Sequence, residues 1–195
     1  MNKCEELSLL KGAKGLSAIV MDIQPKITLS LHDDNLKSLL DSLELLIDTM
    51  GCFSIPIAFT EQVPEKLGVT LSSLSSRLPN SKVIQKNTFS AFGNNVFCDW
   101  LENNDCNHLL LSGIETSICV YLTAIDALRR GIGVTVLSDC ILSRNENDSR
   151  FALKELSKAG ASILSLETVL YSLLGSSNHP EFKTVSNMVK SRGKK

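Results

Sequence analysis

The sequence lacks long apolar runs and shows no excess of charge of either sign. No stretch approaches the roughly 20 apolar residues that span a bilayer, so a membrane is not an expected partner. Lys and Arg total 20 against 21 Asp and Glu, for a net charge of -1, and the basic tail at 191–195 is the only basic block in the sequence. Because binding to nucleic-acid phosphates needs a concentrated positive surface, nucleic acid is not expected as a partner either.

The sequence is also poor in metal-ligand and cofactor patterns. The three histidines, at positions 32, 108 and 179, lie far apart, and none is paired with Cys or Asp at a ligand-like spacing. This argues against a dedicated metal site, although a site assembled in space stays open. No G-x-G-x-x-G motif follows the first expected strand, so no dinucleotide or other cofactor is predicted.

Cysteine usage indicates a reducing compartment. The six cysteines, at positions 4, 52, 98, 106, 119 and 140, form no C-x-x-C pair, and the first residues lack the apolar core of a signal peptide. We therefore expect reduced thiols in a cytoplasmic protein rather than a disulfide framework.

Length and apolar periodicity predict one α/β domain over residues 1–195, with 1–15 as a loosely packed lead-in. Strands are expected at 18–23, 55–60, 82–86, 109–111, 133–139 and 161–166. Helices are expected at 33–50, 94–101, 116–131, 147–159, 168–174 and 180–189, and residues 61–80 are expected to form a long loop. This alternation predicts a doubly wound, three-layer sandwich in which helices cover both faces of a six-stranded parallel sheet.

The stretch from residue 108 to 123 carries an expected strand into a helix with a cysteine at the junction. Thr116 is the predicted N-cap, which makes Cys119 the third helical residue. The unpaired N–H groups and the helix dipole at that position favour a thiolate, so we expect a lowered pKa and a nucleophilic Cys119. The alternative is that Cys119 is a small buried apolar residue, as free cysteines usually are.

Two further residues stand where expected strands end. Asp22 and Lys86, like Cys119, fall at the carboxyl ends of three different strands, and such ends meet at one edge of a parallel sheet. A carboxylate, an ammonium group and a thiol at that edge form a set suited to nucleophilic catalysis. Taken singly, an aspartate after a strand often caps a turn and a lysine at a strand end is usually solvated.

Five motifs make residues 16–190 resemble the isochorismatase-like superfamily of cysteine hydrolases, most closely the isochorismatase-domain-containing proteins of unassigned substrate. The motifs are Met21-Asp-Ile-Gln24, Thr60-Glu-Gln62, Lys86-Asn-Thr-Phe-Ser-Ala-Phe92, Gly113-Ile-Glu-Thr-Ser-Ile-Cys-Val120 and Ser138-Asp-Cys-Ile-Leu-Ser-Arg144. The resemblance implies a catalytic triad of Asp22, Lys86 and Cys119. It also implies a cis peptide between Ile114 and Glu115, and an oxyanion hole made by the backbone N–H groups of Glu115 and Cys119.

By the same resemblance, the protein is expected to be a metal-independent cysteine hydrolase. Asp22 would take the proton of Cys119, the thiolate would attack a carbonyl carbon, and water would hydrolyse the resulting thioester. A cysteine nucleophile favours a small amide or related acyl C–N bond over the vinyl ether that true isochorismatases cleave. Nicotinamidase is disfavoured, because the metal-binding Asp/His cluster of that group has no histidine counterpart at residues 60–65.

Five residues are candidates for contact with a small-molecule substrate. Gln24 and Gln62 are expected to supply neutral hydrogen bonds, and Phe89, Phe92 and Ile118 to supply apolar walls. Surface amides and ordinary core residues are the alternative interpretation of these positions.

Two other functions remain open from the sequence. The chain is alternatively a catalytically idle copy of the fold that serves in assembly or partner binding, or a thiol redox protein in which Cys140 resolves an oxidised Cys119. Because relatives of this fold commonly form homo-oligomers, a homo-oligomer is expected in either case.

Overall fold

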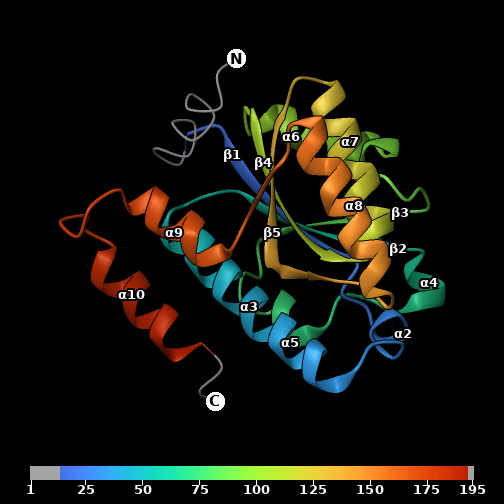
Figure 1. Ribbon diagram of the computed structural model, residues 1–195, viewed down its shortest axis with the longest axis horizontal. Helices are drawn as coiled ribbons and strands as arrows, with labels where there is room; N and C mark the ends of the chain where they lie inside the picture. The colour runs from blue at the N-terminus through green and yellow to red at the C-terminus, as the bar shows by residue number, and fades with distance from the viewer. Residues whose placement is uncertain (1–13, 193–195) are drawn as a thin grey trace.

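The computed structural model describes residues 14–192 and arranges them around one six-stranded sheet with the order β3-β2-β1-β4-β5-β6 (Figure 1). The strands are β1 (Leu16–Met21), β2 (Ile57–Gln62), β3 (Lys82–Lys86), β4 (His108–Ile114), β5 (Gly133–Leu142) and β6 (Ser162–Leu164). Every neighbouring pair is parallel, which confirms the predicted doubly wound α/β fold. The lead-in predicted for residues 1–15 lies, up to residue 13, outside the described residues.

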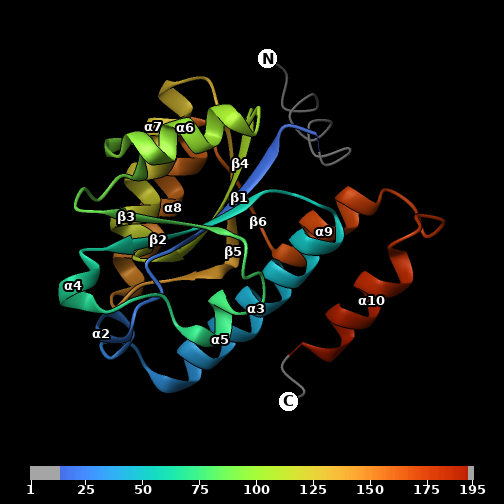
Figure 2. The ribbon, with the colours of Figure 1, turned by 180° about the vertical axis from the view of Figure 1, so that it is seen from behind.

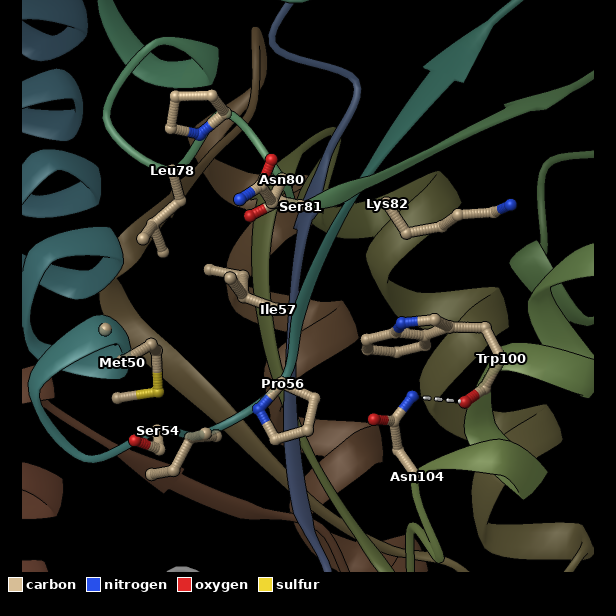
Figure 3. A pocket seen from close by; sticks show the side chains of 13 residues that line it. Met50, Ser54, Pro56, Ile57, Leu78, Asn80, Ser81, Lys82, Trp100 and Asn104 are labelled. Carbon is tan, nitrogen blue, oxygen red and sulfur yellow. Dashed lines mark hydrogen bonds between the residues drawn. The ribbon is translucent and has the colours of Figure 1, made fainter.

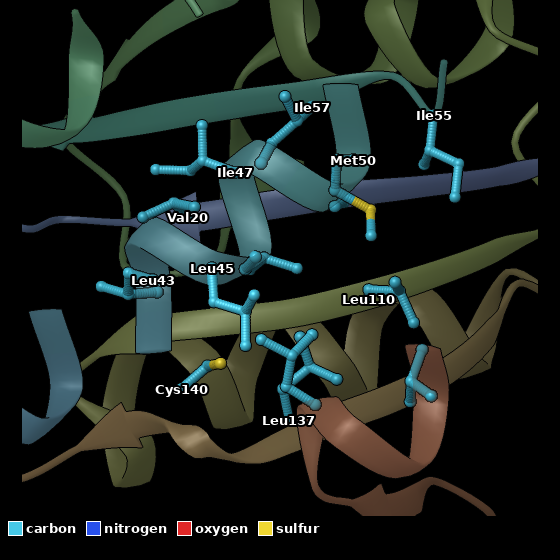
Figure 4. Packing of buried hydrophobic residues seen from close by; sticks show 14 of the residues in the cluster. Val20, Leu43, Leu45, Ile47, Met50, Ile55, Ile57, Leu110, Leu137 and Cys140 are labelled. Carbon is cyan, nitrogen blue, oxygen red and sulfur yellow. The ribbon is translucent and has the colours of Figure 1, made fainter. Parts of the chain in front are cut away.

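Helices cover both sides of the sheet and enclose two cores (Figure 2). One side carries α3 (Asp33–Cys52), α9 (Leu166–Leu174) and α10 (Phe182–Ser191), and the other carries α6 (Asn95–Asn103), α7 (Tyr121–Arg129) and α8 (Glu146–Ala159). On the first side, Leu43, Ile47 and Met50 of α3 pack with Val20 and Leu110 of the sheet (Figure 4). Burial of such side chains is the main favourable term that holds the layers together. Within residues 14–192, no helix has the length and apolar character to cross a bilayer.

Several helix ends follow the expected capping chemistry. The Asn94 side chain accepts the N–H of Val96 at the start of α6, and Asn145 accepts the N–H of Asn147 at the start of α8. Gly160 ends α8 in the left-handed conformation, with φ 107°. These ends can be recognised in the sequence because the capping bonds are local.

Strand ends differ more from the prediction. β2 runs from 57 to 62 rather than from 55 to 60, and β6 is shorter than the predicted 161–166 because Ser165 caps α9. β4 and β5 continue to Ile114 and Leu142, beyond the predicted ends at 111 and 139. The added residues of β4 pair with those of β5 after a shift in register. Because each extension depends on the other strand, neither can be predicted from its own stretch of sequence.

The prediction of one long loop at 61–80 is wrong. Its first two residues belong to β2, and two short helices follow, α4 (Pro64–Leu67) and α5 (Ser72–Ser75). Another short helix, α2 (Pro25–Thr28), follows β1 where none was expected. Pro25 takes its first helical position, where a missing N–H costs nothing, and Gln24 stays extended as the following proline requires.

Part of the predicted basic tail takes part in the fold. Arg192 donates hydrogen bonds to Asp139 Oδ2, at 2.7 Å, and to Ser42 Oγ. These contacts join the end of α10 to β5 and α3, while residues 193–195 lie outside the described part of the chain.

The strand order opens a crevice between β1 and β4. From β1 the chain moves outward to β2 and β3, and then returns to β4 on the other side of β1. At such a reversal the connections leave the carboxyl ends of the two strands in opposite directions, and ligands bind in the space between them.

Gly113 lets β4 approach β1 beside this crevice. It has φ 113°, and a Cβ at that position would lie 2.2 Å from the carbonyl oxygen of Met21. Gly113 therefore lies within β4, beyond the end predicted for this strand at residue 111, and allows a close backbone contact.

Gly113→Ala is expected to lower the free energy of unfolding by about 3 kcal/mol, because it combines left-handed strain with a backbone clash. Gly131→Ala is the matched control, since Gly131 also has positive φ but a Cβ there would meet no atom within 4 Å. The control is expected to lose about 1 kcal/mol. Urea unfolding of both variants measures the difference, and equal losses would contradict this role for Gly113.

Candidate active site

Three separate segments deliver the predicted triad to the carboxyl edge of the sheet. Asp22 follows β1 directly, with φ 57°, and its N–H donates to the carbonyl oxygen of Thr60 at 3.1 Å. Lys86 is the last residue of β3, and Cys119 lies in the π-helical turn η2 (Thr116–Val120) that follows β4. A left-handed conformation is tolerated by Asp, whose short polar side chain can bond locally.

The structure brings these three side chains together. Lys86 Nζ lies 2.7 Å from Asp22 Oδ2 and 3.6 Å from Cys119 Sγ. It also donates to Gln62 Oε1 at 2.6 Å, so the ammonium group has three partners. The other oxygen of Asp22 accepts the Thr60 hydroxyl at 2.7 Å.

The Asp22–Lys86 ion pair is fully buried, with 0% exposure of both side chains. Taking two charges out of water costs several kcal/mol per ion, and this cost is offset only when hydrogen bonds replace the solvent. Thr60 and Gln62 supply those bonds from β2, which lies between β1 and β3. The role of Thr60 was not foreseen, although the residue opens one of the motifs found in the sequence.

The predicted low pKa of Cys119 is wrong. The pKa of this thiol is raised to about 12, chiefly by burial and also by the negative charge of Asp22, while Lys86 opposes the rise. Thr116 is not the N-cap either, because Glu115 holds that position and the Thr116 hydroxyl is buried without a hydrogen-bond partner among the described residues. Cys119 therefore rests as a thiol beside a carboxylate.

The turn that carries Cys119 is organised by Glu115. The peptide bond between Ile114 and Glu115 is cis. The N–H groups of Ile118 and Val120, on either side of Cys119, both donate to the carbonyl oxygen of Glu115, at 3.1 and 3.2 Å. The backbone of Cys119 is thus held between two hydrogen-bonded neighbours.

The carboxylate of Glu115 reaches across to the segment after β5. Its Oε1 accepts from Arg144 Nε at 2.7 Å and its Oε2 accepts the Arg144 N–H at 3.2 Å. Both oxygens are therefore occupied. Arg144 stands at the end of a motif found in the sequence, but no role was predicted for it.

A cavity of about 290 Å³ opens above these groups. Its wall comes from α2, from the ends of β2 and β4, from the turn η2, and from the segments that follow β1, β3 and β5. The lining residues are Asp22, Lys26, Ile27, Ser30, Gln62, Phe89, Ile114, Glu115, Ile118, Cys119 and Arg144. The cavity therefore gives a small molecule access to Cys119 from solvent.

Of the five candidate contact residues, the structure has Gln62, Phe89 and Ile118 on the cavity wall and two away from it. Gln24 is 0% exposed. Its side-chain nitrogen donates to the carbonyl oxygens of Gln62 and Gly68, and its side-chain oxygen accepts the N–H of Gln62. Phe92 packs edge-on against Phe97 in the core on the α6 side. Gln24 thus joins the segment after β1 to β2, and Phe92 is an ordinary core residue.

A larger hollow, of about 550 Å³, lies at the opposite edge of the sheet (Figure 3). Pro56 and Ile57 at the start of β2, Lys82 at the start of β3 and Trp100 of α6 line it. It is lined by none of the residues Asp22, Lys86 and Cys119. Asp22 and Cys119 line the smaller cavity, and Lys86 contacts both of them.

The described residues group no three or more His, Cys, Asp and Glu side chains in a way that could hold a metal ion. In the 60–65 segment, Glu61 is 4% exposed and accepts the N–H of Thr70 at 2.8 Å. Its carboxylate is therefore engaged in holding the segment after α4.

Cys140 lies inside β5 rather than after it. Its side chain is 0% exposed and belongs to the same buried cluster as Val20, Leu43 and Leu137 (Figure 4). Burial raises the pKa of this thiol well above its usual value. A role as the resolving thiol of Cys119 loses its support, because Cys140 is a core residue on the α3 side of the sheet.

Lys86→Met is expected to lower the free energy of unfolding at pH 7 by about 3–5 kcal/mol, because it leaves the Asp22 carboxylate buried without a cation. In the double variant, Asp22→Asn replaces the unpaired carboxylate by a neutral amide and keeps a side chain that tolerates positive φ. The double variant is therefore expected to lose less than the two single losses added together. Urea unfolding gives all three values, and additive losses would show that the pair is not coupled.

Comparison with known proteins agrees with this geometry. Residues 18–168 match the isochorismatase domain. Isochorismatase family protein 1B of Dictyostelium discoideum is 31% identical over 177 residues, covering 89% of this chain and 85% of that protein. The structure of MAR1 ribonuclease from Caenorhabditis elegans is 32% identical, with a TM-score of 0.85 and coverage of 92% and 91%.

A more distant structure shares the fold. YcaC of Escherichia coli, described as an octameric hydrolase of unknown specificity, aligns with a TM-score of 0.80 at 20% identity, covering 92% of this chain and 96% of that one. The range that matches the isochorismatase domain includes Asp22, Lys86 and Cys119. The chain belongs to the isochorismatase family, whose members are generally hydrolases.

Proposed function

We propose that the protein is a cysteine hydrolase that cleaves a small amide or related acyl C–N bond through a thioester on Cys119. The observation that carries the proposal is the position of the Lys86 ammonium group, which touches both the Asp22 carboxylate and the Cys119 sulfur, two groups that line an open cavity. A nucleophile, a base and a group that orients the base within contact of one another are what covalent catalysis requires.

In the first half of the reaction, Asp22 takes the proton of the Cys119 thiol as the sulfur attacks the carbonyl carbon. The new C–S bond converts the carbonyl oxygen into an oxyanion, which the backbone N–H groups of Glu115 and Cys119 stabilise. The C–N bond then breaks, and Asp22 returns its proton to the leaving amine. The enzyme is left as a thioester with Asp22 ionised.

In the second half, Asp22 takes a proton from water as the water oxygen attacks the thioester carbonyl. The C–S bond breaks, the acid product leaves, and the proton held by Asp22 restores the Cys119 thiol. These steps need no metal ion and no cofactor.

The raised pKa of Cys119 is compatible with this sequence. A thiol with a pKa of about 12 is protonated at neutral pH, so a base must act during the attack rather than before it. Asp22 suits that task because Lys86 and Thr60 hold its carboxylate in place. Phe89 and Ile118 on the cavity wall would contact the apolar part of a small substrate.

RNA is a less suitable substrate, although the C. elegans relative is named a ribonuclease. The net charge of -1 and a cavity of about 290 Å³ favour a small molecule over a polyanionic chain. A catalytically idle assembly module is the remaining alternative, and it predicts no covalent intermediate.

Cys119→Ala is expected to reduce kcat/KM at least about a thousandfold on any amide that the wild-type protein hydrolyses, because the nucleophile is gone. Cys52→Ala removes a thiol from the end of α3, outside the cavity, and is expected to retain full activity. A screen of small amides, ureas and esters, with intact-mass detection of an acyl adduct, makes the comparison. Hydrolysis that persists in Cys119→Ala would rule out the mechanism.

We also propose that the protein works as a homo-oligomer. Three of its most exposed large apolar side chains, Leu29, Val69 and Phe89, belong to segments at the carboxyl edge, at 83%, 62% and 57% exposure. An apolar rim of this kind is typical of a subunit contact, and the YcaC fold relative is octameric.

Light scattering is expected to give a mass that is a multiple of 21.3 kDa. Leu29→Asp is expected to shift that mass toward the single chain. The control is Phe151→Asp, which also replaces an exposed apolar side chain by a carboxylate but lies on α8, and it is expected to leave the mass unchanged. A monomeric wild-type protein would contradict the proposal.

A further inference from the structure

We propose that the Cys119 cavity recognises an anionic substrate, a small amide that also carries a carboxylate, through the side chains of Lys26 and Arg144. This inference rests on the proposed amide hydrolysis for the reaction, but not for the recognition of the anion. It follows from which hydrogen-bonding groups on the cavity wall are already occupied.

Every carboxylate oxygen on the cavity wall already has a donor. Asp22 accepts from Thr60 through Oδ1 and from Lys86 through Oδ2. Glu115 accepts from the side chain and the backbone of Arg144, one bond to each oxygen. An amine or other cation on a ligand would therefore compete with Lys86 or Arg144 for these carboxylates.

The amide of Gln62 is occupied as well. Its oxygen accepts from Lys86 at 2.6 Å, and its nitrogen donates to the carbonyl oxygen of Asn87 at 3.2 Å. The hydroxyl of Ser30 donates to the carbonyl oxygen of Ile27 at 2.8 Å. Neutral polar groups on the wall thus have little donor capacity left for a ligand.

The cations of the wall are different. Among residues 14–192, Lys26 Nζ and the two terminal nitrogens of Arg144 make no hydrogen bond to the protein, since Glu115 accepts only from Nε and the backbone N–H. Both side chains are exposed, so these donors face solvent. Both side chains line the cavity that contains Cys119. The wall therefore offers unmatched donors, and a ligand that complements it must supply acceptors.

The charge balance leads to the same conclusion. The negative charges of Asp22 and Glu115 are balanced by Lys86 and Arg144, which leaves Lys26 in excess. A carboxylate is an anion that suits a guanidinium edge and an ammonium group on the wall of one cavity, because its two oxygens can accept hydrogen bonds from such donors. The apolar wall of Ile27, Phe89 and Ile118 would contact the short carbon chain that joins this carboxylate to the amide.

Alkylation of Cys119 tests the recognition without a known substrate. Iodoacetate and iodoacetamide are similar in size and share a leaving group, but only iodoacetate carries a carboxylate. The rate constant for iodoacetate at Cys119 is divided by that for iodoacetamide, and the result is divided by the same ratio for free cysteine. The final value measures the preference of the cavity for an anion. We expect a value of about ten in the wild-type protein at low salt.

Lys26→Gln is expected to lower that value about threefold, because it removes one nearby positive charge. Lys66→Gln, which removes an exposed lysine of α4 that does not line the cavity, is expected to leave it unchanged. A wild-type value of one, or an equal loss in the two variants, would overturn the proposal.

A substrate arm separates this inference from the proposed function. Half-amides of short dicarboxylic acids are compared with the matching neutral diamides, and Lys26→Gln is expected to raise KM about threefold for the half-amides alone. If diamides are hydrolysed as well as half-amides and alkylation shows no preference, the proposal of an anion site is contradicted and the proposal of a hydrolase stands. If alkylation shows a clear preference for iodoacetate but no amide is hydrolysed, the proposal of an anion site stands and the proposal of a hydrolase is contradicted.

Discussion

A buried ion pair between Asp22 and Lys86 determines how the carboxyl edge of this protein is built. The two charges lie 2.7 Å apart with no solvent exposure, so their desolvation has to be offset by neighbouring hydrogen bonds. The middle strand of three supplies them, since β2 lies between β1 and β3 and carries Thr60 and Gln62 at its end. The strand order and the polar residues of the site therefore depend on each other.

The same pair acts on Cys119 with opposite effects. Asp22 raises the pKa of the thiol and Lys86 lowers it, while burial contributes the largest rise. The balance leaves a neutral sulfur at rest, and a carboxylate stands next to it. In the proposed mechanism, charge on the sulfur develops only as a substrate carbonyl is attacked, which limits the time that an unsolvated thiolate must be stabilised.

Much of the fold and the identity of the converging residues could be predicted from the sequence. β3 has the predicted bounds, 82–86, and α6 starts within a residue of the predicted helix at 94–101, with Asn94 as its cap, because short apolar runs and capping bonds are local features. The convergence of Asp22, Lys86 and Cys119 also followed from sequence, since parallel strands present all their carboxyl ends on one edge.

What could not be predicted depends on contacts between distant segments. The pKa of Cys119 follows from burial and from two charges far away in the chain, whereas the local argument considered only the helix dipole. Gln24 looked like a ligand-binding amide, but β2 brings backbone partners to it from residue 62. Lys26 gave no signal at all, because its place on the cavity wall depends on α2, a helix of four residues that the sequence did not suggest.

The ionisation of Cys119 in wild-type and Asp22→Asn protein tests most directly whether the three groups act as one unit. The rate of alkylation by iodoacetamide, measured from neutral pH to the alkaline limit of the folded state, follows the thiolate fraction. The account predicts that the wild-type rate is still rising at that limit, and that Asp22→Asn moves the rise to lower pH because the neighbouring negative charge is gone. Identical profiles for the two proteins would contradict it.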